Sequence, residues 1–87
     1  MQIRRKASAG TMQSSDLMVM VSPGDTLQVE IESTVKKQYE PLIRARIAEV
    51  LQKLEVSAGQ IKVSDRGALD YAIAARIETA IRRASEE

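Results

Sequence analysis

Two short stretches of the chain alternate between apolar and polar residues. Residues 27–32 alternate strictly, and residues 60–64 repeat the pattern over a shorter stretch. This period of two is typical of a β-strand with one covered face. The continuous apolar run Leu17–Val21 predicts a further strand in a buried position, and residues 7–12 are compatible with a short first strand.

Two longer stretches carry apolar residues at the three- and four-residue spacing of amphipathic helices. We predict helices over residues 34–55 and 67–84. Pro41 either kinks the first helix or begins its main body, because an interior proline removes a backbone hydrogen bond. We favour the kink, since the apolar spacing continues through the proline. The predicted apolar faces contain Val35, Tyr39, Leu42, Ile43, Ile47, Val50, Leu51 and Leu54 in the first helix, and Leu69, Ile73, Ile77, Ala80, Ile81 and Ala84 in the second.

The resulting order of elements is β-β-β-α-β-α. Two amphipathic helices covering one face of a three- or four-stranded sheet make an α+β, two-layer sandwich. We expect one domain over residues 1–87, with residues 1–6 flexible. Its predicted core contains Ile31, Ile43, Ile47, Ile61, Ile73 and Ile77.

The composition narrows the range of functions. Thirteen basic and twelve acidic residues give a net charge of +1, which argues against a dedicated nucleic-acid-binding protein. The chain contains no histidine and no cysteine, so it lacks the commonest general base and the best intrinsic nucleophile. An independent enzyme is therefore not expected. The absence of cysteine and of a long apolar run favours a cytoplasmic protein without a membrane span.

A glycine-led polar stretch, Gly10–Asp16, precedes the apolar run at Leu17. Such a stretch is a turn signal, and it places two adjacent serines, Ser14 and Ser15, where another protein can reach them. The simplest interpretation is a hairpin loop whose serines bond to nearby backbone groups.

The basic run formed by Arg4, Arg5 and Lys6 is open to two interpretations as well. In the first interpretation it is a solvated terminus. In the second it is a docking patch that binds either a partner or a phosphate group near the loop.

Three segments of the chain form a distinctive set. They are Ala9-Gly10-Thr11-x-x-Ser14-Ser15-Asp16-x-Met18, then Ser33-Thr34-Val35-Lys36-Lys37-Gln38-Tyr39, and finally Asp65-Arg66-Gly67-Ala68-Leu69-Asp70-Tyr71-Ala72-Ile73-Ala74-Ala75-Arg76. In order and spacing, and over most of the chain, these segments resemble the acyl carrier (gamma) subunit of citrate lyase.

The resemblance implies that Ser14 is esterified by 2'-(5''-phosphoribosyl)-3'-dephospho-coenzyme A, whose thiol carries the acyl group. The implied partners are a prosthetic-group transferase and the catalytic alpha and beta subunits, which cleave citrate to acetate and oxaloacetate through acetyl and citryl thioesters. Gly10, Ser15 and Asp16 would support the loop. Ser15 falls where relatives can have glycine, although Ser15 would be the exposed residue if Ser14 bonded inward.

Two alternatives remain. Within the same class, the chain resembles the acyl carrier subunit of malonate decarboxylase, which uses the same kind of arm. Outside it, the chain is a non-catalytic interaction module that binds phosphates through Arg4, Arg5 and Lys6.

Overall fold

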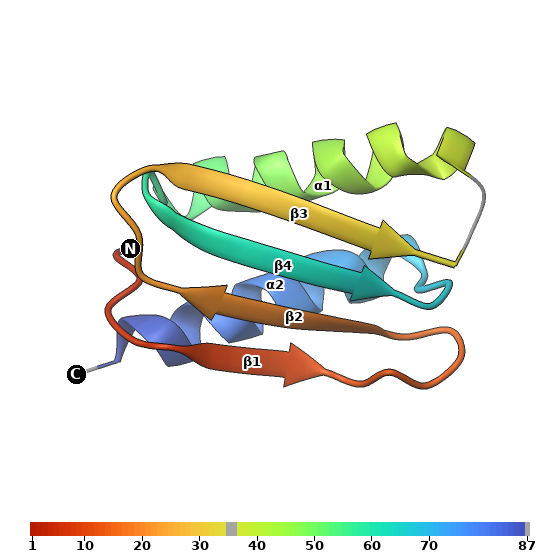
Figure 1. Ribbon diagram of the computed structural model, residues 1–87, viewed down its shortest axis with the longest axis horizontal. Coiled ribbons are helices and arrows are strands. Elements are labelled where there is room, and N and C mark those ends of the chain that lie inside the picture. Colours follow the sequence, from red (N-terminus) through yellow and green to blue (C-terminus); the bar gives the residue numbers. More distant parts are fainter. Residues whose placement is uncertain (35–36, 87) are drawn as a thin grey trace.

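The computed structural model describes residues 1–34 and 37–86, and they form a single sheet with two helices (Figure 1). The elements follow one another as β1 (Ala7–Gly10), β2 (Leu17–Ser22), β3 (Leu27–Ser33), a 3-10 turn (Lys37–Tyr39), α1 (Glu40–Lys53), β4 (Gly59–Asp65) and α2 (Asp70–Ser85). This is the predicted β-β-β-α-β-α order.

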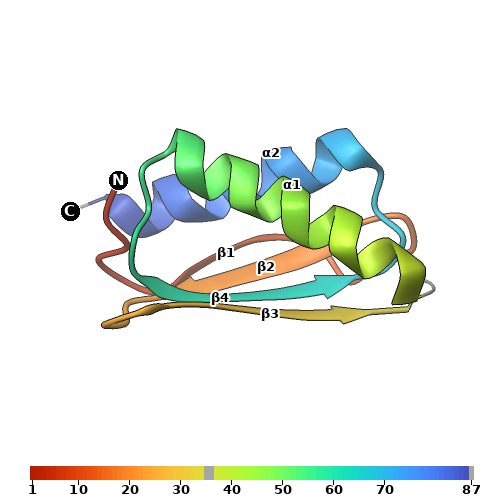
Figure 2. The same cartoon turned by 90° about the horizontal axis from the view of Figure 1, so that it is seen from above.

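The sheet has the strand order β1-β2-β4-β3. The pairs β1–β2 and β2–β4 are antiparallel, whereas β3 and β4 run parallel, joined by α1. Both helices lie on one face of the sheet, and the other face is open (Figure 2). The prediction of a two-layer α+β sandwich is therefore confirmed.

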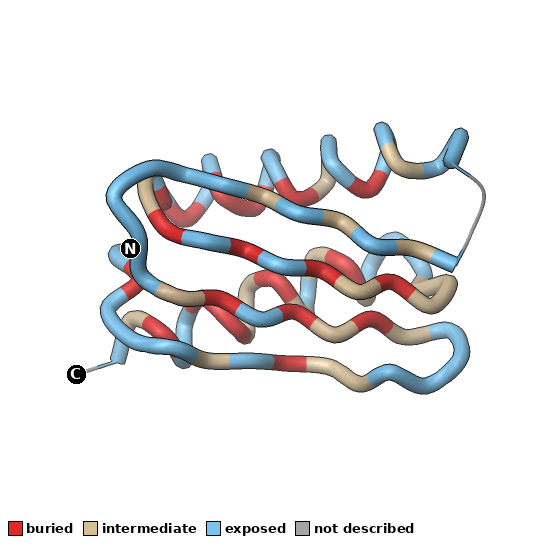
Figure 3. The backbone as a smooth tube through the Cα atoms, viewed as in Figure 1, coloured by how far each residue is buried: buried red, intermediate tan, exposed pale blue. Residues whose placement is uncertain are grey.

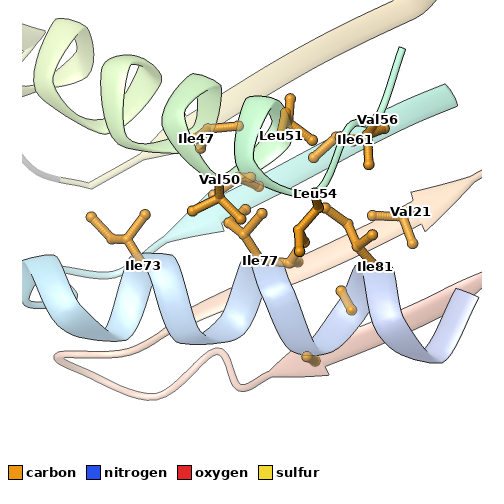
Figure 4. Packing of buried hydrophobic residues seen from close by; sticks show 14 of the residues in the cluster. Val21, Ile47, Val50, Leu51, Leu54, Val56, Ile61, Ile73, Ile77 and Ile81 are labelled. Atoms are coloured by element: carbon orange, nitrogen blue, oxygen red, sulfur yellow. The ribbon is translucent and has the colours of Figure 1, made fainter. Parts of the chain in front are cut away.

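The core lies between the helices and the two central strands, β2 and β4. Along these strands buried residues alternate with more exposed ones, as Figure 3 shows. Ile73, Ile77 and Ile81 of α2 point toward Val50 and Leu54 at the end of α1 and toward the sheet (Figure 4). Five of the six predicted core isoleucines are buried, namely Ile43, Ile47, Ile61, Ile73 and Ile77.

The sixth, Ile31, is only partly buried, because β3 is an edge strand of the sheet. Leu27 at the start of the same strand is 40% exposed. The alternating pattern correctly identified the strand and its inward face. It overestimated the burial, since a residue on an edge strand has a neighbouring strand on one side only.

The first helix differs from its prediction at Pro41. The helix is not kinked; α1 begins at Glu40, with the proline in its first turn, where its missing N–H costs no hydrogen bond. Tyr39 and Leu42 are exposed, at 46% and 66%, so the buried face of α1 begins at Ile43. Val35, which was predicted on this face, lies outside the described residues.

The second helix begins at Asp70, three residues after the predicted start. Leu69 precedes it in an extended conformation and is 58% exposed, so its assignment to the apolar face was wrong. The remaining residues predicted on that face, from Ile73 to Ala84, are buried.

The N-terminal segment, residues 1–6, lies against the end of α2. Ile3 is buried, and the backbone N–H groups of Arg4 and Arg5 donate to the carbonyl of Ala84, at 2.9 and 3.2 Å. Arg4, Arg5 and Lys6 themselves are exposed. Neither α1 nor α2, the α-helices of the described residues, is long and apolar enough to cross a bilayer.

Candidate functional site

The loop of residues 11–16, which we call the serine loop, joins β1 to β2 at the end of the sheet far from the two termini (Figure 1). Ser14 is exposed near the middle of this loop. Within residues 1–34 and 37–86 its hydroxyl makes no hydrogen bond, and the same holds for the hydroxyl of Ser15. The alternative in which Ser14 bonds inward is therefore not what the structure shows.

Gly10, the last residue of β1, leads into the loop with φ at +91°, a conformation that favours glycine. A Cβ at this position would lie 1.9 Å from the carbonyl oxygen of Leu17 and 3.3 Å from Cδ of Arg76. The glycine thus lets the two strands and the stem of Arg76 approach closely at the base of the loop.

Asp16 is the centre of a hydrogen-bond network that fixes the loop. Its carboxylate accepts the Thr11 hydroxyl at 2.7 Å and the backbone N–H of Leu17 at 2.8 Å. Nε and Nη2 of Arg76, on α2, donate to its two oxygens at 3.2 and 3.1 Å. The Thr11 hydroxyl in turn accepts the N–H of Gln13 at 3.2 Å. One carboxylate therefore connects both sides of the loop with the helix layer.

These bonds stabilise the ionised carboxylate. The Thr11 hydroxyl, the N–H of Leu17 and the Arg76 guanidinium, in that order, lower the pKa of Asp16 to about 2. At neutral pH Asp16 is ionised and its oxygens are occupied by these donors, so it is poorly suited to act as a general base for Ser14.

A second loop, which follows β4, pairs with the serine loop through its backbone. The N–H of Ser15 donates to the carbonyl of Arg66 at 2.8 Å, and the N–H of Arg66 donates to the carbonyl of Asp16 at 2.9 Å. Ser15 adopts φ of +66°, a left-handed conformation that glycine tolerates best. This explains physically why glycine is acceptable at this position.

The loop after β4 is fixed in the same way as the serine loop. Asp65 is buried, and its carboxylate accepts the Ser33 hydroxyl at 2.9 Å and the N–H of Ala68 at 3.0 Å. Arg66 donates to the Glu32 carboxylate at 2.9 Å. The segments that carry the sequence resemblance thus meet at one end of the molecule.

Sequence reasoning placed Gly10, Ser14, Ser15 and Asp16 in one polar stretch before Leu17. The structure has the last three in the loop and Gly10 at the end of β1. Sequence reasoning missed Arg76 and the backbone contact with Arg66, because both lie at least 50 residues further along the chain. The only available signal was that both residues belong to the third of the resembling segments.

The basic run does not lie near the loop. Arg4, Arg5 and Lys6 precede β1 at the end of the molecule that holds both termini, whereas the loop between β1 and β2 lies at the other end (Figure 1). The expectation that these cations contact a phosphate group near the serine loop is therefore wrong.

The site combines the exposed hydroxyl of Ser14 with a loop whose backbone is held by Asp16 and Arg66. The chain contains no histidine or cysteine. In the part of the chain that the structure describes, no group of three or more residues could hold a metal ion.

Comparison with known proteins agrees with this picture. A family model described as the malonate decarboxylase delta subunit, an acyl carrier protein, matches residues 4–84. A citrate lyase acyl carrier protein from Haemophilus influenzae is 48% identical over 87 residues, covering 100% of this chain and 92% of the relative. The corresponding protein from Treponema denticola is 41% identical, with both chains covered completely. The chain belongs to the citrate lyase acyl carrier protein family.

Solved structures support the fold of this family member. It superimposes on a chain of a Pseudomonas malonate decarboxylase hetero-tetramer, in complex with malonate, with a TM-score of 0.72. The sequence identity is 22%, and the match covers 95% of this chain and 87% of the other. A Thermus thermophilus protein gives a TM-score of 0.71 at 16% identity, with the match limited to 16% of that longer chain.

Proposed function

We propose that this family member carries an acyl group on 2'-(5''-phosphoribosyl)-3'-dephospho-coenzyme A attached to Ser14. The exposed Ser14 hydroxyl, without a partner in the described residues, is the observation that supports this most directly. A group attached there extends into solvent, and its attachment breaks none of the hydrogen bonds that hold the loop. Because the loop is fixed by Asp16 and Arg66, such a group would start from a defined point.

The thiol of this group would hold acetyl and citryl residues as thioesters. The chain's own contribution is positional: Gly10, Ser15 and Asp16 shape the loop, and Arg76 anchors it to α2. Attachment to one small subunit raises the concentration of the acyl group at the catalytic sites of the alpha and beta subunits. Those subunits would cleave citrate to oxaloacetate and acetate.

Attachment requires a separate transferase. A serine hydroxyl is a weak nucleophile without an adjacent base. Asp16, the acidic residue of the loop, is held as an ionised hydrogen-bond acceptor with its pKa near 2. The base that activates Ser14 is therefore expected to come from the transferase.

Co-expression with the transferase and the enzyme that forms its donor, followed by peptide mass spectrometry, tests the attachment. We expect the mass increment on Ser14, its loss in Ser14→Ala, and its retention in Ser15→Ala. Both variants should keep the melting temperature of the parent, since both side chains are exposed. An increment on Ser15, or a loaded Ser14→Ala protein, would overturn the assignment.

A carrier for malonate decarboxylase is the second candidate. The family model and the superposition with the Pseudomonas chain favour it, whereas identities of 41% to 49% with citrate lyase carriers favour the first. Reconstitution of the loaded protein with each set of catalytic subunits separates the two. We expect cleavage of citrate and no release of carbon dioxide from malonate.

A further inference from the structure

Five exposed cationic side chains gather at the end of the molecule opposite Ser14. They come from the N-terminal segment and from the last turn of α2, and we call them the basic end: Arg4, Arg5, Lys6, Arg82 and Arg83. The two segments are held side by side by the hydrogen bonds from the N–H groups of Arg4 and Arg5 to Ala84. The cluster is thus created by the fold from residues nearly 80 positions apart.

Two of these cations donate hydrogen bonds to backbone carbonyls of the protein. Nη1 of Arg83 donates to the carbonyl of Ser8 at 2.9 Å, and Nε of Arg5 donates to the carbonyl of Arg83 at 3.2 Å. Neither carbonyl carries a formal charge, so neither bond neutralises its guanidinium. The basic end is therefore partly ordered before any partner binds.

Among the described residues, carboxylates pair with some of these cations and not with others. Arg5 pairs with Glu86 at 3.0 Å, and Arg82 pairs with Glu78 at 2.9 Å. In the described residues neither Lys6 nor Arg83 has a carboxylate partner. A complementary surface would therefore need to supply carboxylates.

The cluster borders a hollow on the open face of the sheet, and most of the residues that line this hollow are polar or charged. One of them is a carboxylate, Glu30, which pairs with Lys62 at 3.9 Å. The hollow, of about 540 Å³, begins at Lys6 and Ser8 and reaches Met20 and Lys62. Met20 is 46% exposed there. An exposed methionine surrounded by polar and charged groups is compatible with a protein interface, where methionine is enriched and the rim is polar.

We propose that the basic end, together with this hollow, is where the carrier is held by an acidic surface of a catalytic subunit of its own assembly. The inference rests on the proposed function, which supplies such subunits. The molecule is 35 Å long, and the loop between β1 and β2, which contains Ser14, lies at the opposite end (Figure 1). A subunit that binds the basic end leaves the serine loop free to serve more than one catalytic site.

A protein partner fits better than a nucleic acid or a membrane. The whole chain has a net charge of +1, whereas proteins that bind polyanions usually carry a large basic excess. Both tyrosines, Tyr39 and Tyr71, lie outside the basic end, so it offers no aromatic side chain for base stacking.

The test measures the association rate of the unmodified full-length carrier with the purified alpha–beta subcomplex as the salt concentration is varied. Lys6→Glu and Lys37→Glu make a matched pair. Both positions are exposed, and both changes alter the net charge by the same amount. Lys37 serves as the control because it lies between β3 and α1, outside the basic end. We expect Lys6→Glu to slow association about fivefold at low salt, and Lys37→Glu to change it about twofold at most. Lys6→Glu combined with Arg83→Glu should slow it roughly tenfold or more. The difference should shrink as salt is added.

Several outcomes would overturn the inference. Equal effects of the two lysine variants, or no effect of the double variant, would exclude the basic end. Comparable binding of the wild-type carrier to phosphatidylserine vesicles or to duplex DNA at physiological salt would favour another partner. Lys6→Glu alone should retain the parent's melting temperature and its loading at Ser14. Failure of the wild-type carrier to bind the subcomplex at all would instead count against the proposed function.

Discussion

The connections at the two ends of strand β2 are held in very different ways. At its start the serine loop is held by contacts from α2 and from the loop after β4. At its end the turn of residues 23–26 is exposed throughout, and its Thr26 carbonyl accepts one hydrogen bond, from the N–H of Gly59 at 3.1 Å. One connection is therefore determined by distant residues and the other mainly by its own Pro-Gly sequence.

This difference matches the functions that we assign to the two ends. A carrier has to present its attachment point in a form that a transferase recognises, which favours a fixed loop around a free hydroxyl. The opposite end needs only a stable surface for docking. Substitutions that affect the two connections differently therefore test the comparison.

We expect the largest difference in stability between alanine at Gly10, just before the serine loop, and alanine at Gly24, in the turn after β2. Gly10→Ala forces a Cβ to within 1.9 Å of a backbone oxygen at positive φ, and should destabilise the fold by about 3 kcal/mol. Gly24→Ala meets its nearest atoms at 3.4 Å or more, and should change stability by about 0.5 kcal/mol at most. Urea unfolding of both variants measures the difference. Similar losses would show that the serine loop is not more constrained than the turn.

The next largest difference in stability is expected between substitutions of Asp16, in the serine loop, and of Asp25, in the turn after β2. Asp16→Asn removes an ionised acceptor whose side chain is 16% exposed, and should cost about 2 kcal/mol at pH 7. Asp25→Asn, in the exposed turn, should cost about 0.5 kcal/mol or less.

The cost of Asp16→Asn should depend on pH in a defined direction. Because the pKa of Asp16 is lowered to about 2 in the folded protein, its ionised form stabilises the fold above the unfolded pKa of about 4. This stabilisation is lost as the pH falls from about 4 to about 2. The stability difference between wild type and Asp16→Asn should therefore shrink over this range, and a constant difference would contradict the role of the charge.

The contrast between the two connections also explains how much the sequence could predict. Residues 22–25 contain their own turn signal, and the loop at Ser14 was identified from its glycine and serines. The firm hold on that loop depends on Arg66 and Arg76, whose contacts with Asp16 exist only after β4 and α2 have packed. Local patterns do not contain such contacts.

The errors in the fold have the same origin. Tyr39 and Leu42 continue the apolar spacing of α1, but the sheet does not cover them. The pattern also gave no strand order, so the edge position of β3 and the reduced burial of Ile31 were not foreseen. Periodicity indicates which face of an element turns inward, whereas the extent of burial depends on the neighbouring elements.

The smallest predicted effect distinguishes the two serines by their backbone alone. Among the described residues other than glycine, φ is positive at Ser15 and Glu55 but not at Ser14. Glycine relieves the left-handed strain at Ser15 at a cost in chain entropy, so Ser15→Gly should stabilise the fold by about 0.5 kcal/mol. Ser14→Gly gains no such relief and should destabilise it by about 0.5 kcal/mol.

Thermal unfolding of the two variants side by side measures the sign of each change, and mass spectrometry after loading measures the function. Ser15→Gly should carry the full mass increment, because the Ser14 hydroxyl and the Asp16 network are unchanged. Ser14→Gly should carry none. If Ser15→Gly proved the less stable of the pair, its left-handed conformation would not be a cost to the loop. Glycine would then be acceptable at this position for some reason other than backbone strain.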